Sequence, residues 1–466
     1  MSGATTAPAG VFGGLVPRRR RGAELFLLVM ALLLGVGAYA LVGLGASDEL
    51  PQDLPLYGGS LVGLALVSHI VVRLKAPYAD PVLLPTVIAL NGIGLAMIKR
   101  IDLGRAESFS AITTFAPQQL LWTAVSMLAF VVTLLVISDH RRLQSLTYTV
   151  GFLGLALLLL PLLPVIGANI NGARIWIRVA GFSFQPGEVA KICLAIFFAG
   201  YLVAKRDALA LAGRRLLGID LPRGRDLGPI LAMWLVSLAV LVFQRDLGSS
   251  LLFFGLFVTL LYVATQRASW LVVGAVLFSA GAYLGYLKFG HVQTRVDGWL
   301  DPFSDPGAYY QIIQGQYGLA WGGILGRGLG QGAPQITPYA WSDFIGTSLG
   351  EELGLAGLMA LIMMYALIVE RALRTALICR DAFGKLLATG LAVAIALQVF
   401  VVIGGVTNLI PLTGLTTPFL SQGGSSLLAN WIVIALLLRI SDRARQPLPD
   451  VRLPAADDET AVVKLR

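Results

Sequence analysis

Charged residues are scarce in this chain of 466 residues: they make up 13% of it, about half the share that is usual in soluble proteins. Hydrophobic residues make up 56%, and the mean hydropathy is +0.78. This balance excludes an ordinary soluble globular protein and indicates an integral membrane protein. The apolar runs are long and continuous, so helices are expected rather than the short alternating segments of a β-barrel.

Cysteine and histidine are also rare. The two cysteines, Cys193 and Cys379, lie in or beside apolar runs, which argues against a disulfide framework and against a cysteine metal site. The histidines His69, His140 and His291 are scattered and show no metal-ligand spacing. The net charge is +9, but in a membrane protein basic residues first report topology, and no nucleic-acid partner is predicted.

Apolar runs of about 17 to 25 residues can cross a bilayer of about 30 Å as helices. We identify twelve such runs, which predict an all-α, polytopic membrane protein with about twelve transmembrane helices. They cover residues 23–46, 54–74, 80–98, 117–138, 146–167, 187–204, 227–243, 248–265, 268–287, 345–369, 385–406 and 425–441.

Basic residues cluster in the segments that connect alternate runs. Because cytoplasmic segments carry an excess of Lys and Arg, this pattern predicts that both termini are cytoplasmic, as tails 1–22 and 443–466. The densest basic cluster follows the sixth run and holds Lys205, Arg206, Arg214, Arg215, Arg223 and Arg225. The unusual loops 168–186, 288–344 and 407–424 then lie outside.

Two of these outer loops have a composition that an ordinary connector does not need. The loop 288–344 is long and rich in aromatic residues, so we expect it to be folded. The segment 407–426 combines prolines and glycines at membrane depth, and irregular backbone is tolerated there only beside protein or a wet cavity.

The segment 168–191 places Arg174 and Trp176 in an alternating pattern that is typical of a membrane interface. Pro186 suits the first turn of the helix that follows. Glu188 and Lys191 lie three residues apart near its start. They form either a simple helix-end pair or a charge pair that lines a cavity, and ionisable groups in spanning helices favour the cavity.

Two further motifs carry carboxylates. Arg245 and Asp246 occupy a short polar turn between two apolar runs, which by itself is an ordinary turn. Asp343 is either an N-cap or a functional residue at the end of the long loop. Glu351 and Glu352 follow, about 12 Å deeper if the helix is continuous, where two adjacent carboxylates need a partner or a wet cavity.

Outer basic residues cluster near these motifs, against the usual bias. The cluster indicates an anionic ligand such as a phosphate, or simply the charge of solvated loops. Its members are Arg174, Arg178, Lys191, Arg245, Lys288, Arg295 and Arg327.

Taken together, the motifs resemble the shape, elongation, division and sporulation (SEDS) family, which includes RodA and FtsW. The motifs are NGARIWI…FQPGEVAK, QRDLGSS, YYQIIQGQYGLAWGGILGRGLGQG, SDF before GEELGLAG, and PLTGLTTPFLSQGGSS, in the family's order over roughly residues 117–442. The resemblance implies a membrane core of ten helices at 80–442. The helix pair at 23–75 would then be an N-terminal extension.

The resemblance also implies a peptidoglycan glycosyltransferase of the bacterial cytoplasmic membrane, with its active site outside. Such an enzyme polymerises lipid II, uses an undecaprenyl-diphosphate-linked glycan, and works among membrane lipids with a class B penicillin-binding transpeptidase. Asp343 would be the catalytic residue. The residues that would bind the substrate diphosphate or support the site are Arg174, Trp176, Glu188, Lys191, Arg245, Asp246, Arg295, Glu351, Glu352 and Ser425.

No metal cage is evident, and Mg²⁺ or Mn²⁺ would bridge phosphates and one carboxylate. The sequence departs from the family pattern at Arg245, where proline is usual, and at Gln422, where tyrosine is usual, and RodA-like elongation is favoured over FtsW-like division. Two alternatives stay open: a flippase or transporter of lipid-linked precursors, and a scaffold for a transpeptidase without its own chemistry.

Overall fold

The computed structural model describes residues 19–109, 113–164, 166–170, 172–179, 182–205, 214–216, 219–221 and 224–447. Most of the predicted cytoplasmic tails therefore lies outside the described residues. Helices dominate the described part. They are α1 (Arg21–Ser47), α2 (Leu54–Lys75), α3 (Leu83–Phe109), α4 (Ala116–Val136), α5 (Arg141–Ser145), α6 (Thr147–Leu159), α7 (Pro186–Ala204), α9 (Gly224–Phe243), α10 (Leu247–Thr265), α11 (Ser269–Lys288), α12 (Gly290–Leu300), α13 (Tyr310–Gly322), α14 (Ile345–Ile378), α15 (Ala382–Val406) and α16 (Gly424–Arg445), with short 3₁₀ turns η1 (Leu160–Leu162) and η2 (Pro334–Ile336).

Each of the twelve predicted runs overlaps one of these helices. Among the described residues, ten helices are long and apolar enough to cross a membrane by length and composition. The apolar stretches at α6 and α9, Thr147–Leu162 and Gly228–Phe243, are shorter. The chain is therefore an integral membrane protein, and ten of the twelve predicted spans are clear among the described residues.

The all-α prediction is wrong for the segment after α6, which forms a small antiparallel sheet. Its strands are β1 (Gly167–Ile170), β2 (Ala173–Val179) and β3 (Phe182–Phe184), in the order β1-β2-β3. Trp176 pairs with Ala168 across the first two strands. The alternation of Arg174, Trp176 and Arg178 with isoleucines has the two-residue period of a strand, which explains the outcome. A second hairpin joins β4 (Arg214–Leu216) to β5 (Ile219–Leu221).

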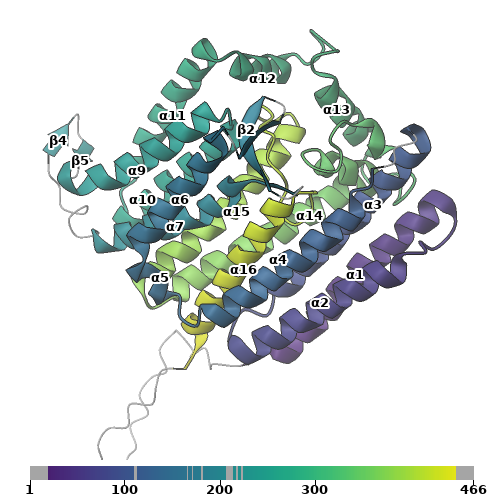
Figure 1. Cartoon of the computed structure of the whole chain (residues 1–466), viewed down its shortest axis with the longest axis horizontal. Helices are drawn as coiled ribbons and strands as arrows, with labels where there is room; N and C mark the ends of the chain where they lie inside the picture. The colour runs from purple at the N-terminus through teal and green to yellow at the C-terminus, as the bar shows by residue number, and fades with distance from the viewer. Residues whose placement is uncertain are drawn as a thin grey trace, which may run out of the picture.

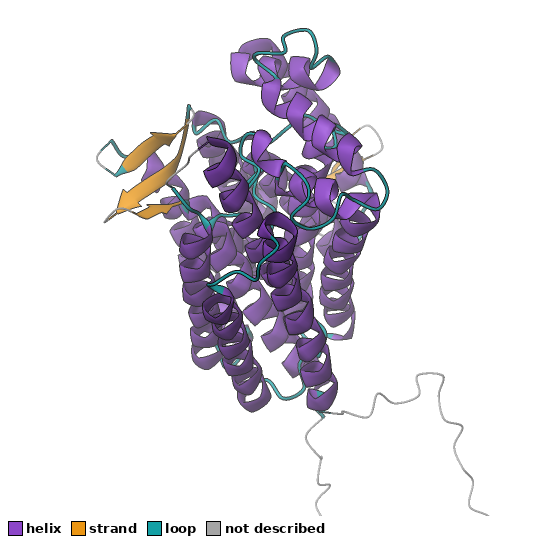
Figure 2. Ribbon diagram, turned by 90° about the vertical axis from the view of Figure 1, so that its right-hand side faces the viewer, coloured by secondary structure: helices purple, strands orange, loops and turns teal. Residues whose placement is uncertain are grey.

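The helices run along one bundle, with the β1–β3 sheet, α12 and α13 at one end (Figures 1 and 2). The start of α1 and the end of α16 meet at the other end, around the segment between α2 and α3. There Arg21 donates to the carbonyl of Ala79 at 2.7 Å, and Arg445 pairs with Asp80 at 2.6 Å.

The first two helices form a layer at the edge of the bundle (Figure 1). Within this layer α1 lies against α3, and the closest approach joins two glycines. A β-carbon at Gly35 would lie 3.0 Å from the α-carbon of Gly92, so both positions need glycine for this packing. As a result, α3 is almost completely enclosed by protein.

The helix α14 is not the continuous helix that the sequence predicted. At Gly354 φ is 70° and ψ is −176°, a conformation that glycine alone adopts readily. The amide of Leu355 donates to the carbonyl of Gly323 at 2.9 Å, and the amide of Gly328 donates to the carbonyl of Glu352 at 2.9 Å. The long outer loop thus supplies the backbone partners that the broken helix lacks.

Candidate active site

A pocket of about 590 Å³ lies at the end of the bundle that carries the sheet. Its wall comes from β2, β3 and α12, from the first turns of α4, α7, α13 and α16, and from the segments before α10 and α14 and after α15. Six of the predicted site residues line it together, although they are spread over 168 positions of the sequence (176 to 343). They are Trp176, Glu188, Arg245, Asp246, Arg295 and Asp343.

Six helices begin at this pocket, among them α4 through Gln118 and α13 through Gln311. Glu188 and Gly424 lie in the first turns of α7 and α16, Asp246 directly precedes α10, and Asp343 lies two residues before α14. The N-terminus of a helix carries about half a positive charge and unpaired amide groups, which favour an anion. The backbone alone therefore makes this pocket suitable for a negatively charged ligand.

Asp343 is half-buried and has a cation nearby. Its Oδ1 accepts a hydrogen bond from the Ser342 hydroxyl at 3.1 Å. Burial raises the pKa of the Asp343 carboxyl to about 6, and the Ser342 hydrogen bond and the charge of Arg295 offset this rise only in part. A carboxyl group with this pKa is mostly ionised at neutral pH and can still accept a proton.

Arg295 lies between the two aspartates of the pocket. Its Nη1 donates to the carbonyl of Leu412 at 2.9 Å, which fixes the guanidinium against the segment after α15. Burial lowers the pKa of Arg295, whereas the charges of Asp246 and Asp343 raise it. No carboxylate among the described residues lies within ion-pair distance of Arg295, so the cation can bind an anionic group.

The turn before α10 contributes two charged residues, Arg245 and Asp246, to the pocket wall. Asp246 caps α10 by accepting the Ser249 amide at 2.9 Å. Arg245 adopts a left-handed conformation with φ of 61°, which is uncommon for a residue other than glycine. The turn directs an exposed arginine and a buried aspartate to the same pocket, and the sequence alone left it as an ordinary polar turn.

Glu188 and Lys191 form the charge pair that their spacing predicted, and both are buried. The Lys191 Nζ lies 2.9 Å from Glu188 Oε2 and donates to Gln398 Oε1 at 2.7 Å. The amide of Gln398 in turn donates to the carbonyl of Thr416 at 2.9 Å. Glu188 and Thr416 both line the pocket, so Lys191 holds two of its walls together from behind.

Five predicted residues do not line the pocket: Lys191, which lies behind it, and Arg174, Ser425, Glu351 and Glu352. Arg174 is exposed on β2, and the Ser425 hydroxyl accepts the Gln185 amide at 2.8 Å. Glu352 accepts hydrogen bonds from Arg100 at 2.8 Å and from the Gly330 amide at 3.0 Å. Glu351 accepts the Ala333 amide at 2.6 Å. The two glutamates thus hold the long loop in place.

Apart from Trp176, sequence reasoning assigned no aromatic or amide side chain to the pocket. Ligand sites commonly combine such apolar faces with a few hydrogen-bonding groups. Their only signal in the sequence is their place near the outer ends of the predicted helices and in the long loop. They are Gln118, Trp122, Gln311, Tyr339, Trp341 and Gln422.

The family model described as "Cell cycle protein" (FTSW_RODA_SPOVE) matches residues 81–446. The chain belongs to this FtsW/RodA/SpoVE family. It is 51% identical to the peptidoglycan glycosyltransferase RodA of Mycobacterium tuberculosis over 431 residues, 92% of each chain. It is 49% identical to the RodA of Mycobacterium leprae over 96% of each chain. The match to the family model begins after α2. The alignments with the two mycobacterial proteins are longer than this match, at 431 and 451 residues.

More distant members of the FtsW/RodA/SpoVE family agree. A probable peptidoglycan glycosyltransferase FtsW from Trichlorobacter lovleyi is 34% identical over 78% of this chain and 93% of its own. A solved structure described as "Structural coordination of polymerization and crosslinking by a peptidoglycan synthase complex" contains a chain that is 27% identical, with a TM-score of 0.61. The alignment covers 79% of this chain and 99% of that one.

Proposed function

We propose that this protein is a RodA-like peptidoglycan glycosyltransferase that polymerises glycan strands for cell elongation. It would transfer the lipid-diphosphate-linked nascent glycan to the sugar 4-hydroxyl of lipid II. The observation that carries this proposal is that Asp343 and Arg295 line one pocket, at which six helices begin. The 51% identity to RodA of Mycobacterium tuberculosis supports the elongation role over the division role.

In this reaction the lipid II hydroxyl attacks the anomeric carbon of the donor sugar. The bond from that carbon to the lipid diphosphate breaks, and the diphosphate leaves with the electron pair. Asp343 accepts the hydroxyl proton, a role that is worth about 10²- to 10⁴-fold in rate. Arg295, Arg245 and the helix N-termini stabilise the charge that develops on the departing diphosphate. A single displacement inverts the anomeric centre.

Mg²⁺ or Mn²⁺ is the ion that we expect beside the diphosphate. Mg²⁺ is usually held by one or two carboxylates together with substrate phosphates, and the carboxylate of Asp246 in the pocket wall fits that donor set. Such an ion would neutralise charge on the leaving group. Chelation with EDTA is expected to abolish polymerisation, and either ion should restore it. Full activity in EDTA would contradict the role of the ion.

The rate should depend on pH through Asp343. Because the pKa of this carboxyl is raised to about 6, it binds a proton earlier than an ordinary aspartate as the pH falls. A protonated carboxyl is no base, so the rate should fall about tenfold per pH unit below pH 6. Initial rates of lipid II polymerisation between about pH 5 and pH 8 test this. A rate that stays constant from pH 7 down to pH 5 would contradict it.

We further propose that all twelve apolar helices cross the bacterial cytoplasmic membrane, with both termini in the cytoplasm and the pocket outside. The helices that start beside the pocket run to the opposite end of the bundle, and basic residues gather at that opposite end. This distribution fits the excess of basic residues in cytoplasmic loops. Residues at that far end include Lys75, Arg141, Arg142, Lys205, Arg380 and Arg445.

This topology predicts which positions a membrane-impermeant thiol reagent reaches in intact spheroplasts. Both native cysteines are buried, so the background should be low. A cysteine at Asp305 in the outer loop should be labelled, and a cysteine at Arg142 should be labelled only after the membrane is permeabilised. The reverse pattern would overturn the orientation.

The activity itself is tested with purified lipid II and the purified protein, alone and with a class B penicillin-binding transpeptidase. We propose the transpeptidase as the partner because the solved relative is described as part of a complex that coordinates polymerisation and crosslinking. Long glycan chains are the expected product. If no polymer forms but labelled lipid II crosses a vesicle membrane, the transporter alternative replaces the enzyme.

A further inference from the structure

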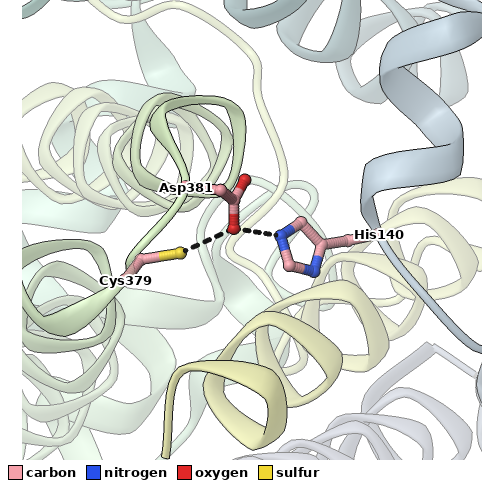
Figure 3. Close-up of side chains that lie close together, drawn as sticks. All are labelled: His140, Cys379 and Asp381. Atoms are coloured by element: carbon pink, nitrogen blue, oxygen red, sulfur yellow. Dashed lines mark hydrogen bonds and ion pairs between the residues drawn. The ribbon is translucent and has the colours of Figure 1, made fainter. Parts of the chain in front are cut away.

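Three metal-ligating side chains meet at the end of the bundle opposite the pocket. His140 directly precedes α5, in the turn that follows α4, and Cys379 and Asp381 flank the turn between α14 and α15. Figure 3 shows the imidazole and the thiol directed toward one oxygen of the Asp381 carboxylate. His140 Nε2 lies 3.0 Å and Cys379 Sγ lies 3.3 Å from that Oδ2. All three ligand atoms lie within 4.8 Å of one another.

We propose that His140, Cys379 and Asp381 bind a zinc ion. Tetrahedral zinc takes nitrogen and oxygen at about 2.0–2.2 Å and sulfur at about 2.3 Å, which places ligand atoms roughly 3.3–3.6 Å apart. The two contacts with Asp381 already approach this spacing, so side-chain rotation alone can close the set. A thiolate with an imidazole selects zinc over Mg²⁺ or Ca²⁺, which prefer oxygen ligands.

The surroundings match those of a metal site in three ways. The His140 side chain is 0% exposed, and Cys379 is also buried. The second ring nitrogen, Nδ1, is buried without a hydrogen-bond partner, and a carboxylate oxygen of Asp139 lies 3.7 Å from it. A carboxylate that moves within hydrogen-bond distance of this nitrogen would orient a metal-bound histidine. The two oxygens of Asp381 have separate partners: Oδ1 caps α15 through the Gly384 amide at 2.6 Å, and Oδ2 faces the other two ligands.

A cavity of about 220 Å³ adjoins the cluster and includes Asp381 in its wall. It gives an ion a path of entry and gives a water molecule room to complete the coordination. Arg141 lies 3.7 Å from Asp381 Oδ2 and is half exposed, so it can turn toward solvent when a cation binds. The ion would link two turns that are 239 residues apart in sequence (140 to 379), which is why spacing in the sequence predicted no site.

The proposal is tested on the full-length protein, freed of metal and kept reduced with a phosphine. Titration with Co²⁺ should give one equivalent of a four-coordinate spectrum with a thiolate-to-cobalt charge-transfer band, and zinc should displace it. Cys379→Ser should lose the band. Cys193→Ser is the matched control, since this cysteine is also buried but lies in α7, away from the cluster. A band that survives Cys379→Ser, or no band at all, overturns the site.

A second measurement does not depend on how the variants fold. X-ray absorption of the zinc-loaded wild-type protein should show one sulfur neighbour at about 2.3 Å and nitrogen or oxygen neighbours at about 2.0 Å. A zinc shell with oxygen and nitrogen only places the ion elsewhere and overturns the proposal. A wild-type protein that retains less than a tenth of an equivalent of zinc after desalting also overturns it, because Asp381, His140 and Cys379 would then only hydrogen-bond.

Discussion

Replacing Asp343 by asparagine is expected to lower the rate of lipid II polymerisation by about 10²- to 10⁴-fold, because the amide cannot accept the hydroxyl proton. Asparagine keeps the size of the side chain and can still accept the Ser342 hydrogen bond, so folding should be preserved. Glycan chains formed with time are measured on gels, with wild type and variant at equal concentration and equal content of folded protein.

Asp305 provides the matched control for this experiment. It lies in the same outer loop, is exposed, and accepts backbone amides from Gly307 and Ala308 at 3.1 Å, a cap that asparagine can also form. Asp305→Asn should therefore polymerise at the wild-type rate. If Asp343→Asn also retains full activity, Asp343 is not the base. Asp246 or Glu188 would then be the candidate, since both carboxylates line the pocket and Glu351 does not.

Replacing Arg100 by methionine is expected to destabilise the protein by about 3–5 kcal/mol, because it leaves the carboxylate of Glu352 buried without its cation. The Arg100 Nε lies 2.8 Å from Glu352 Oε1, and both side chains are almost fully buried. Thermal unfolding in detergent measures the change. The double variant with Glu352→Gln should recover part of the loss, since no charge is then left unpaired.

The neighbouring residue is a control for general effects of removing a cation from α3. Lys99 pairs with Asp53 at 2.5 Å, but these side chains are 20% and 31% exposed. An exposed pair contributes about 0–1 kcal/mol, so Lys99→Met should have a small effect. Equal losses for Arg100→Met and Lys99→Met would show that the Arg100–Glu352 pair does not hold the outer loop.

The positions of the helices could be predicted because a membrane-spanning helix needs a continuous apolar run, and such runs are visible in the sequence. Every predicted run overlaps a helix, even though two of the helices are too short to be clear spans. The break at Gly354 could not be predicted in this way, since a single glycine in an apolar run does not reveal a φ of 70°. That conformation is stable only because a loop about 30 residues earlier pairs with the broken end, and such pairing is a property of the folded protein.

Some residues of the candidate site could likewise be predicted from the sequence, and others could not. Charged residues such as Asp343 and Glu188 could be identified because a charge at membrane depth is costly and needs a reason. Trp122 and Gln311 gave no such signal, since an aromatic or amide side chain near a helix end is common. Glu351 and Glu352 are also charged residues at membrane depth, but they do not line the pocket. Hydrogen bonds from loop amides and from Arg100 offset the free-energy cost of burying their carboxylates. Which carboxylate faces a ligand depends on contacts between distant segments.

The enclosure of α3 has a consequence for how the protein enters the membrane. Of the ten clear spans, α3 is both the least apolar and the most completely buried, and it carries Asn91, Arg100 and Asp102 in its interior positions. A helix with this content partitions weakly into lipid alone. Because α1 and α2 precede it in synthesis and α1 packs along it, they can receive α3 as it leaves the ribosome. Removing the first pair should therefore impair biogenesis before it affects catalysis.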